Sequence, residues 1–224
     1  MQSKLYKNRF TFFLISQLSI VFGSLIFPIA LFEEKMMPIL FLINIAVGIL
    51  LIAKQKVLFW MYLIFFVSSL FIYGFDALQR NDFEDNIAFR FGVYFLFYVT
   101  VSVSIIKQVW NAKQVSRKVI IGLMSGYLSL GFIGFFMFSA IELYEPNSFS
   151  GLRIENNALV EKLDALLYYS YITMLTIGYG EISPVTPIAQ KAAVLVGLIG
   201  QFYTVIITAV VVEKYIRHSV TDAK

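Results

Sequence analysis

The chain has 224 residues, of which 59% are hydrophobic and only 14% charged, and its mean hydropathy is +0.78. This composition is too apolar for a soluble domain of ordinary usage and indicates a membrane protein. Cysteine is absent and His218 is the single histidine, which excludes disulfides and the usual zinc sites. The net charge of +4 comes from basic residues in short loops, and this pattern indicates membrane topology rather than nucleic-acid binding.

The first half of the chain predicts four membrane helices. Residues 10–32 are 23 mostly apolar positions after a basic start, enough to cross a hydrocarbon core of about 30 Å. A signal peptide is the alternative, but its apolar region would be shorter and would end at a small-residue cleavage site. A polar turn at residues 33–35 leads to a second apolar segment at residues 37–53, and a turn at residues 54–56 leads to a third at residues 57–75. The fourth apolar segment is residues 87–106. A polar loop at residues 76–85 precedes the last of them.

A basic connector at residues 107–118 leads to a fifth long helix at residues 119–141. This helix contains four glycines: Gly122, Gly126, Gly131 and Gly134. They can be positions where another helix approaches closely, or they can reflect the high glycine content of membrane helices. The polar loop at residues 142–161 is too hydrophilic to be buried in lipid. Residues 162–175 fit a half-length helix that enters the membrane and turns back, and residues 188–214 form the last long helix.

An uncharged run of five residues lies between these last two helices: Thr176, Ile177, Gly178, Tyr179 and Gly180. A dehydrated cation needs a cage of oxygens, and consecutive backbone carbonyls can line a narrow pore if the chain alternates between left- and right-handed conformations. Gly178 and Gly180 permit this at little steric cost. The Thr176 hydroxyl would add an oxygen at the inner end, while the Ile177 and Tyr179 side chains would pack behind the run. Because each chain carries the run once, a closed cage needs several copies of the chain; the resemblance described next implies a homotetramer.

The potassium-channel family has a selectivity filter that the run TIGYG resembles. The wider stretch from Tyr168 to Thr186, YYSYITMLTIGYGEISPVT, resembles the pore helix, filter and outer mouth of the same family. The resemblance is loose over the remainder of residues 119–214. It departs at Leu175, commonly a second threonine in the family, and at Glu181, usually an aspartate. The resemblance implies a potassium-selective channel, not an enzyme, with no cofactor besides the permeant ion.

The resemblance also implies roles for particular residues. Potassium would bind at the carbonyls of four filter residues: Thr176, Ile177, Gly178 and Tyr179. Glu181 would support the filter from behind by bonding to a pore-helix group such as Tyr168 or Tyr169. Gly200 stands where the inner helix of the family often has a hinge glycine; the alternative is a close-packing position against the pore helix, since a lone glycine does not prove bending.

The implied fold class is an all-α membrane protein with six transmembrane helices plus a re-entrant pore helix and selectivity filter, assembled as a tetramer. Residues 1–106 would form a four-helix domain laid out like a voltage sensor, residues 107–118 a cytoplasmic linker, and residues 119–224 the pore domain. Voltage-gated relatives carry arginines at every third position of the fourth helix, where this chain has only Arg90. We therefore expect a voltage-insensitive channel, because steep gating needs about 3 to 4 charges per subunit.

The charge distribution predicts that both termini are cytoplasmic in a multi-pass protein of the cell (plasma) membrane. With that orientation most of the 18 basic residues are cytoplasmic, and 12 of the 14 acidic residues, all except Glu213 and Asp222, face outward. The acidic outer face would concentrate cations at the mouth. Regulation would come from the filter, from lipid, from protons at the inner helix ends, where His218 could titrate, or from a separate regulatory protein.

Other functions fit the sequence less well. A weakly selective cation channel is one alternative, but Tyr179 is kept where less selective relatives replace it. A transporter-like uptake protein would fuse four filter repeats in one chain, and this chain has one. A non-channel membrane scaffold or an enzyme could line a site with Asn44, Gln190 and Gln201, but these residues pair no nucleophile with a base and are better interpreted as interhelical hydrogen-bond partners.

Overall fold

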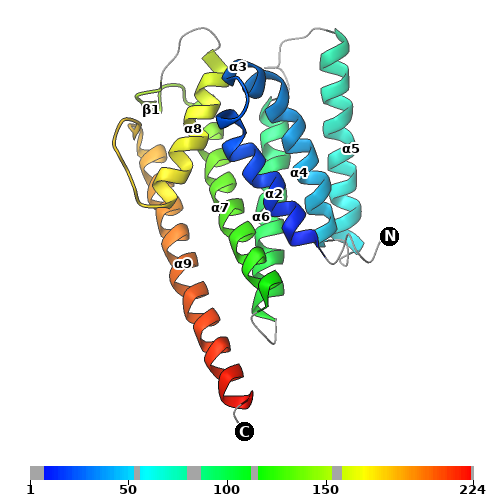
Figure 1. Cartoon of the computed structure of the whole chain (residues 1–224). Helices are drawn as coiled ribbons and strands as arrows, with labels where there is room; N and C mark the ends of the chain where they lie inside the picture. Colours follow the sequence, from blue (N-terminus) through cyan, green and yellow to red (C-terminus); the bar gives the residue numbers. More distant parts are fainter. Residues whose placement is uncertain (1–7, 53–55, 80–86, 112–115, 153–157, 223–224) are drawn as a thin grey trace.

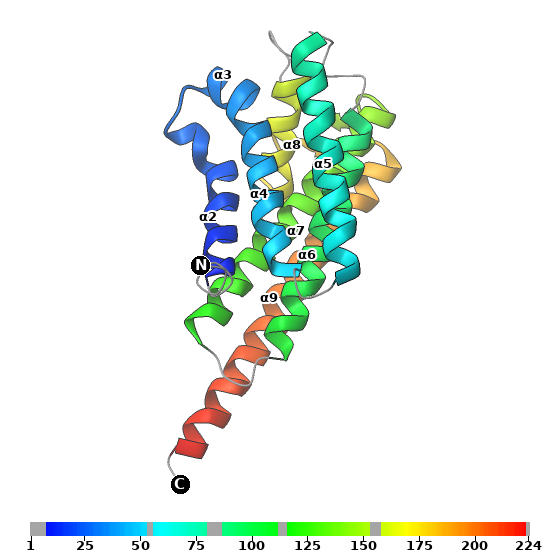
Figure 2. The same ribbon diagram turned by 90° about the vertical axis from the view of Figure 1, so that its right-hand side faces the viewer.

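The computed structural model describes residues 8–52, 56–79, 87–111, 116–152 and 158–222, which form a bundle of long helices (Figure 1 and Figure 2). Apolar runs adopt helices in a membrane because the backbone must satisfy its own hydrogen bonds there. The long helices are α2 (Arg9–Phe22), α4 (Met37–Ile52), α5 (Lys56–Gln79), α6 (Ile87–Trp110), α7 (Arg117–Tyr144), α8 (Ala158–Met174) and α9 (Pro187–Asp222). Some predictions lie outside this description: those made for the side chain of His218 and for residues 1–7, 53–55, 80–86, 112–115, 153–157 and 223–224.

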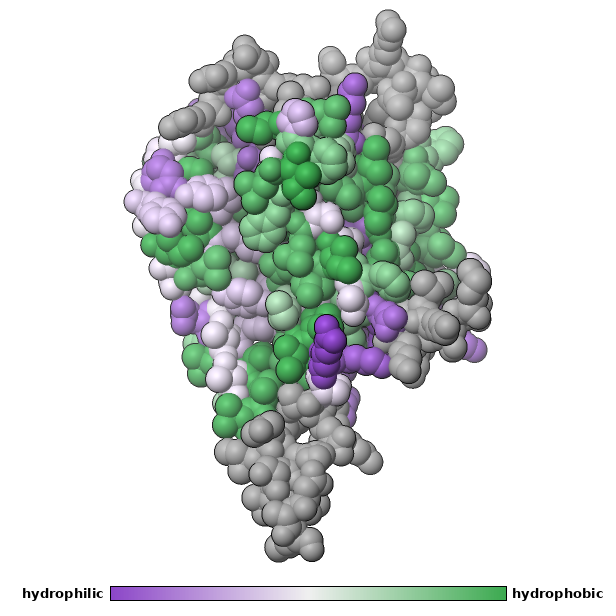
Figure 3. All heavy atoms as spheres, in the orientation of Figure 1, coloured by the Kyte–Doolittle hydropathy of each residue, from purple (hydrophilic) through white to green (hydrophobic). Residues whose placement is uncertain are grey.

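Three helices of the described chain are long and apolar enough to cross a membrane: Phe89–Trp110, Arg117–Tyr144 and Pro187–Glu213. Two shorter apolar helices, Arg9–Leu25 and Met37–Ile52, accompany them. Apolar side chains cover much of the molecular face shown in Figure 3. These lengths and this surface support a helical membrane protein, as the composition predicts.

The prediction of one continuous helix over residues 10–32 is wrong. Helix α2 ends at Phe22 and is followed by a 3₁₀ turn, η1 (Gly23–Leu25), and by the short helix α3 (Ile29–Leu31). Pro28 explains the interruption, because a proline has no N–H to donate and disfavours helical backbone at the residue before it. The chain then folds back, so that the Phe32 ring fills the space a side chain at position 23 would need.

The predicted polar turn at residues 33–35 is also wrong, because these residues belong to a π-helical segment, η2 (Phe32–Met36), that runs directly into α4. Other helices extend into segments predicted as polar loops. Helix α5 continues through Gln79, α6 continues to Trp110 inside the predicted linker, and α7 continues to Tyr144. A nucleated helix gains one hydrogen bond for each residue that it adds, so it can continue past the end of an apolar run.

Helix α7 lies at the centre of the fold, with α6 running along it and α2 packed against it, while α5 is peripheral (Figure 1 and Figure 2). Aromatic rings join α4, α6 and α7. The Tyr98 ring stacks on Phe132 with their centroids 4.8 Å apart, and Phe41 packs edge-on against Phe132 and Phe136 at 5.6 Å. The helices of the first half of the chain and α7 therefore share one core.

Buried polar side chains form hydrogen bonds through the same region. Tyr98 donates to the Asn44 amide oxygen (2.6 Å), and the Asn44 amide nitrogen donates to the Ser16 hydroxyl (2.7 Å). Gln17 in α2 donates to Ser129 in α7 (2.8 Å). The prediction that Asn44 bonds between helices is confirmed, and the bonds satisfy groups whose burial would otherwise cost free energy.

A small antiparallel sheet departs from the predicted all-α fold. Strand β1 (Phe149–Ser150) pairs with strand β2 (Ser183–Pro184), with Phe149 opposite Pro184. The backbone N–H of Val185 also donates to the Ser148 carbonyl at 2.8 Å. The pairing joins the loop after α7 to the segment between residue 180 and α9.

Candidate functional site

The run from Thr176 to Gly180 follows the C-terminus of α8 and leads back toward β2. Three of its residues have left-handed backbone: Thr176 (φ 58°), Gly178 (56°) and Gly180 (93°). Ile177 and Tyr179 do not, so the handedness alternates along the run. Apart from the adjoining residues of the chain, no described atom lies within 4 Å of the position of a Cβ on Gly178 or Gly180. Glycine is favoured at these two positions by the backbone conformation and not by lack of space.

The start of the run is tied to the last turn of α8. The Thr176 N–H donates to the Thr173 carbonyl at 3.0 Å, and the Ile177 N–H donates to the Ile172 carbonyl at 2.9 Å. A longer bond of 3.3 Å joins the Gly178 N–H to the same Ile172 oxygen. The helix and the run are therefore one local unit, and the position of α8 determines the position of the run.

Close contacts with α7 position α8. Ser170 donates to the Gly131 carbonyl (2.6 Å), and the Tyr171 hydroxyl donates to the Leu128 carbonyl (2.9 Å). A side chain at Gly131 would meet the Tyr171 ring, and one at Gly134 would meet the Ser170 hydroxyl. The prediction that glycines of this helix allow another helix to approach closely is confirmed at both positions.

Glu181 follows the run and lies near the helix behind it. The Tyr168 hydroxyl lies near the Glu181 carboxylate, and its interaction with this carboxylate raises the pKa of Tyr168 to about 12. Tyr169 has other neighbours: its ring centroid lies 5.0 Å from that of Phe138 and 5.4 Å from that of Phe149. Of the two tyrosines expected near Glu181, the structure therefore places Tyr168 against it and Tyr169 in an aromatic cluster.

The outer loop touches the run more closely than the sequence indicated. Gly151 has φ +83° and lies against the backbone carbonyl of Glu181, leaving no space for a side chain. Ser183 donates to the Gly180 carbonyl at 3.3 Å, and Thr186 donates to the Ser148 hydroxyl at 3.1 Å. Together with the β1–β2 pairing, these contacts tie the outer end of the run to the loop after α7.

A buried carboxylate holds this loop in place. Glu142 is only 5% exposed and accepts hydrogen bonds from the backbone N–H groups of Asn147 (3.1 Å) and Ser148 (3.0 Å). Its third donor is the ammonium of Lys162 in α8, at 3.2 Å. Sequence reasoning assigned Glu142 to the solvated loop. No local signal distinguishes it from the other acids there, because its charged partner Lys162 lies 20 residues away and its two nearer partners are backbone N–H groups, which every residue except proline has.

Gly200 lies at the contact between α9 and the end of α8. A Cβ at this position would be 2.5 Å from the Met174 carbonyl oxygen, whereas the nearest atom to a Cβ at Gly197 would be 3.9 Å away. Helix α9 continues without a break from Pro187 to Asp222. This geometry favours the close-packing interpretation of Gly200, and the hinge stays a prediction.

Several apolar side chains of the run are uncovered in the single chain. Tyr179 is 73% exposed, Leu175 is 47% exposed and Ile177 is 45% exposed. Much of α9 is exposed as well, including Leu198, Phe202 and Val205. The chain by itself does not provide the packing that was expected behind Ile177 and Tyr179.

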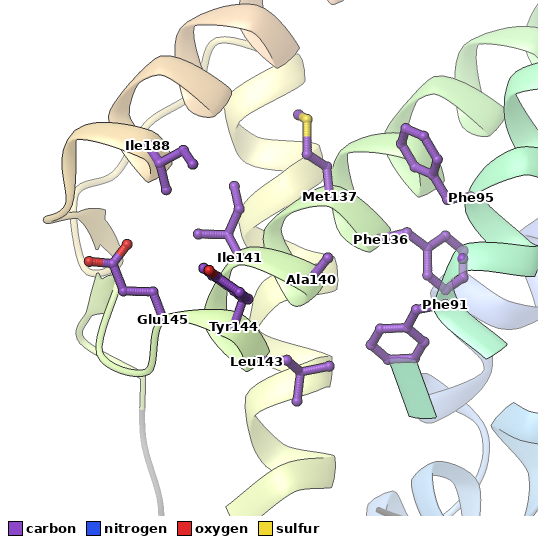
Figure 4. Close-up of a pocket in the computed structure, with 11 residues that line it drawn as sticks. Phe91, Phe95, Phe136, Met137, Ala140, Ile141, Leu143, Tyr144, Glu145 and Ile188 are labelled. Atoms are coloured by element: carbon purple, nitrogen blue, oxygen red, sulfur yellow. The ribbon is translucent and has the colours of Figure 1, made fainter. Parts of the chain in front are cut away.

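A separate apolar groove lies between α6, α7 and the start of α9, with a volume of about 660 Å³ (Figure 4). Phe91, Phe136, Met137 and Ile188 are among its lining residues, and Glu145 lies at its edge. Apart from Tyr144 and Glu145 the lining consists of apolar side chains, which offer a cation no oxygens, so the groove is a poor path for ions. The run at residues 176–180 has the better chemistry, because it presents a succession of backbone carbonyls and one hydroxyl.

Residues 122–217 match the family model described as "Ion channel". A search of the curated proteins and a search of the solved structures each return no significant match. The matched segment begins in α7, includes α8 and the run, and ends in α9, so this part of the chain resembles an ion-channel domain.

This resemblance and the apolar helices support a membrane protein that transports ions. Channels of this kind need no cofactor, only the permeant ion. Within the described residues no group of three or more His, Cys, Asp or Glu side chains could hold a metal ion.

Proposed function

We propose that the chain forms a potassium-selective channel whose filter is the run from Thr176 to Gly180. The observation that carries the proposal is the left-handed backbone at Thr176, Gly178 and Gly180, inside the segment that resembles ion channels. Alternating handedness turns successive carbonyls to one side of the chain, where they can replace the hydration shell of an ion. Potassium binds at the carbonyls of Thr176, Ile177, Gly178 and Tyr179, with the Thr176 hydroxyl at the inner end.

The functional unit is a homotetramer in the lipid bilayer. One chain supplies a single column of carbonyls, and a cage needs several columns around an axis. The exposed apolar side chains support this assembly, because Tyr179, Ile177 and the face of α9 need neighbours that one chain does not supply. Six transmembrane helices cross the plasma membrane with both termini in the cytoplasm, following the distribution of basic residues.

Residues 1–106 form a four-helix domain without gating charges, residues 107–118 a cytoplasmic linker, and residues 119–224 the pore domain. Arg90, the one arginine between residues 87 and 106, lies near the start of α6 with a buried side chain. One charge per subunit is below the about 3 to 4 that steep voltage gating requires. The channel is therefore voltage-insensitive, and its activity depends on the filter, on lipid or protons, or on a separate regulatory protein.

Glu181 supports the filter from behind through its interaction with Tyr168, while Tyr169 anchors the same helix to its aromatic neighbours. The interaction between the Tyr168 hydroxyl and the Glu181 carboxylate supports this role. Glu181→Gln keeps the size of the side chain and removes its charge, and we expect it to speed the loss of current during sustained conduction. Unchanged inactivation and selectivity in that variant would contradict the role.

The decisive experiment is a reversal potential measured with purified protein in planar bilayers under a potassium and sodium gradient. We expect a reversal potential near the potassium equilibrium value, and no current from Gly178→Ala, because alanine disfavours left-handed backbone. Equal permeability to both ions would replace this proposal by a weakly selective cation channel. The absence of any current would favour a non-channel membrane scaffold.

Voltage insensitivity is tested in the same preparation. A nearly linear conductance over a range of holding potentials is expected. A sigmoidal conductance curve with an effective charge well above about four per tetramer would contradict it.

A further inference from the structure

Gln201 in α9 contacts the filter directly. Its amide nitrogen donates to the Thr176 hydroxyl oxygen over 3.4 Å, a long hydrogen bond that joins two residues 25 positions apart. Thr176 is the first left-handed residue of the run, and its hydroxyl is the side-chain oxygen that the run offers to an ion. The contact thus lies at the innermost end of the carbonyl column.

The register of this contact is set by close packing. Gly200 lies against the Met174 carbonyl, with no space for a side chain between them, and this brings α9 next to the end of α8. Tyr203 donates to the Leu123 carbonyl in α7 at 2.7 Å and holds the neighbouring turn of α9. With residues on both sides fixed, Gln201 is the side chain of α9 that faces Thr176.

Gln201 is exposed in the single chain, as is much of α9 around it, including Phe202 and Ile206. Three of the exposed residues recur at helical spacing from Gln201 and form a stripe with it: Val205, Thr208 and Val212. Thr208 donates its hydroxyl proton to the Thr204 carbonyl at 2.7 Å. In a tetramer built around the filter, a stripe that begins at the filter faces the central axis, so Gln201 lines the space immediately inside the innermost ion site.

We propose that Gln201 sets the cation affinity of the innermost site of the pore, an inference that rests on the proposed function. Its N–H group occupies one lone pair of the Thr176 hydroxyl, and that lone pair is then not available to an ion. The amide also directs the positive end of its dipole toward the site. Both effects weaken cation binding there, so that an ion leaves the filter toward the inner side more easily.

The test is block of potassium current by barium, applied to the side of the membrane that faces the C-terminal end of α9. Gln201→Met keeps the length of the side chain and removes the donor, so we expect barium to bind about threefold to tenfold more tightly, the range that one hydrogen bond is worth. Gln201→Glu replaces the donor with a charged acceptor and should bind barium more tightly still. Gln201→Asn keeps the amide but is too short to reach Thr176, and it should behave like Gln201→Met.

Gln190→Met is the matched control, because Gln190 lies on the same helix but bonds to the Val185 carbonyl at 3.2 Å near the outer end. It should leave this barium block unchanged. The inference is refuted if the three Gln201 variants conduct potassium and are blocked by barium like the wild type. Failure of the proposed function is separate, because the wild type would then pass no potassium-selective current; if one variant does not assemble, the other two still decide the question.

Discussion

Removal of the buried carboxylate at position 142 should destabilise the outer part of the channel domain. Glu142→Ala leaves three donors without their acceptor: two backbone N–H groups and the Lys162 ammonium. Breaking a buried ion pair by deleting one partner costs about 3–5 kcal/mol. Lys162 is 22% exposed and can turn toward water, so we expect the lower end of this range, about 3 kcal/mol. For a chain of this size that loss lowers Tm by about 6–12 °C.

Thermal unfolding of the purified protein in detergent, followed by tryptophan fluorescence, measures this effect. Glu145→Ala is the matched control: it removes an exposed acid three residues away, and it should stay within about 0.5 kcal/mol of the wild type. Glu142→Gln keeps one acceptor oxygen and should lose less, about 1–2 kcal/mol.

A double-mutant cycle with Lys162→Met then isolates the ion pair from the two backbone hydrogen bonds. If Glu142→Ala unfolds at the same temperature as Glu145→Ala, the inferred role of the buried carboxylate is incorrect. If the cycle shows no coupling between positions 142 and 162, the two backbone N–H groups account for any loss.

Two glycine substitutions test the contacts around the filter, each by thermal unfolding and potassium flux. Gly151→Ala should lower stability by about 2 kcal/mol or more, because the new methyl group meets the Glu181 carbonyl and the left-handed backbone disfavours alanine. Gly92→Ala is the control, because apart from adjoining residues and the backbone of its own helix no described atom lies within 4 Å of a Cβ at that position. Equal losses of stability in the two variants would contradict the contact between Gly151 and Glu181. Gly200→Ala should cost about 1–3 kcal/mol and Gly197→Ala much less, since a Cβ at Gly200 would be 2.5 Å from the Met174 carbonyl oxygen, whereas one at Gly197 would lie 3.9 Å from the Thr173 carbonyl oxygen. Normal stability of Gly200→Ala with altered opening would instead support a hinge.

The sequence by itself determined the class of protein and the local backbone of the site. Apolar runs longer than a bilayer crossing predict helices, because lipid offers a backbone no hydrogen-bond partners. The glycines at positions 178 and 180 predict left-handed backbone, because a residue without a Cβ adopts it readily. These properties depend on neighbouring residues along the chain, so a linear pattern is sufficient. The break at Pro28 also has a local cause, and its signal was present in the sequence.

Only the tertiary structure decided which distant side chains meet. Tyr168 and Tyr169 are adjacent in sequence, yet Tyr168 lies near Glu181 and Tyr169 packs among aromatic rings, because successive residues of a helix point about 100° apart. Gln201 reaches Thr176 because Gly200 allows α9 to approach α8. Such partners lie many residues apart, and no local pattern encodes the packing of helices that brings them into contact.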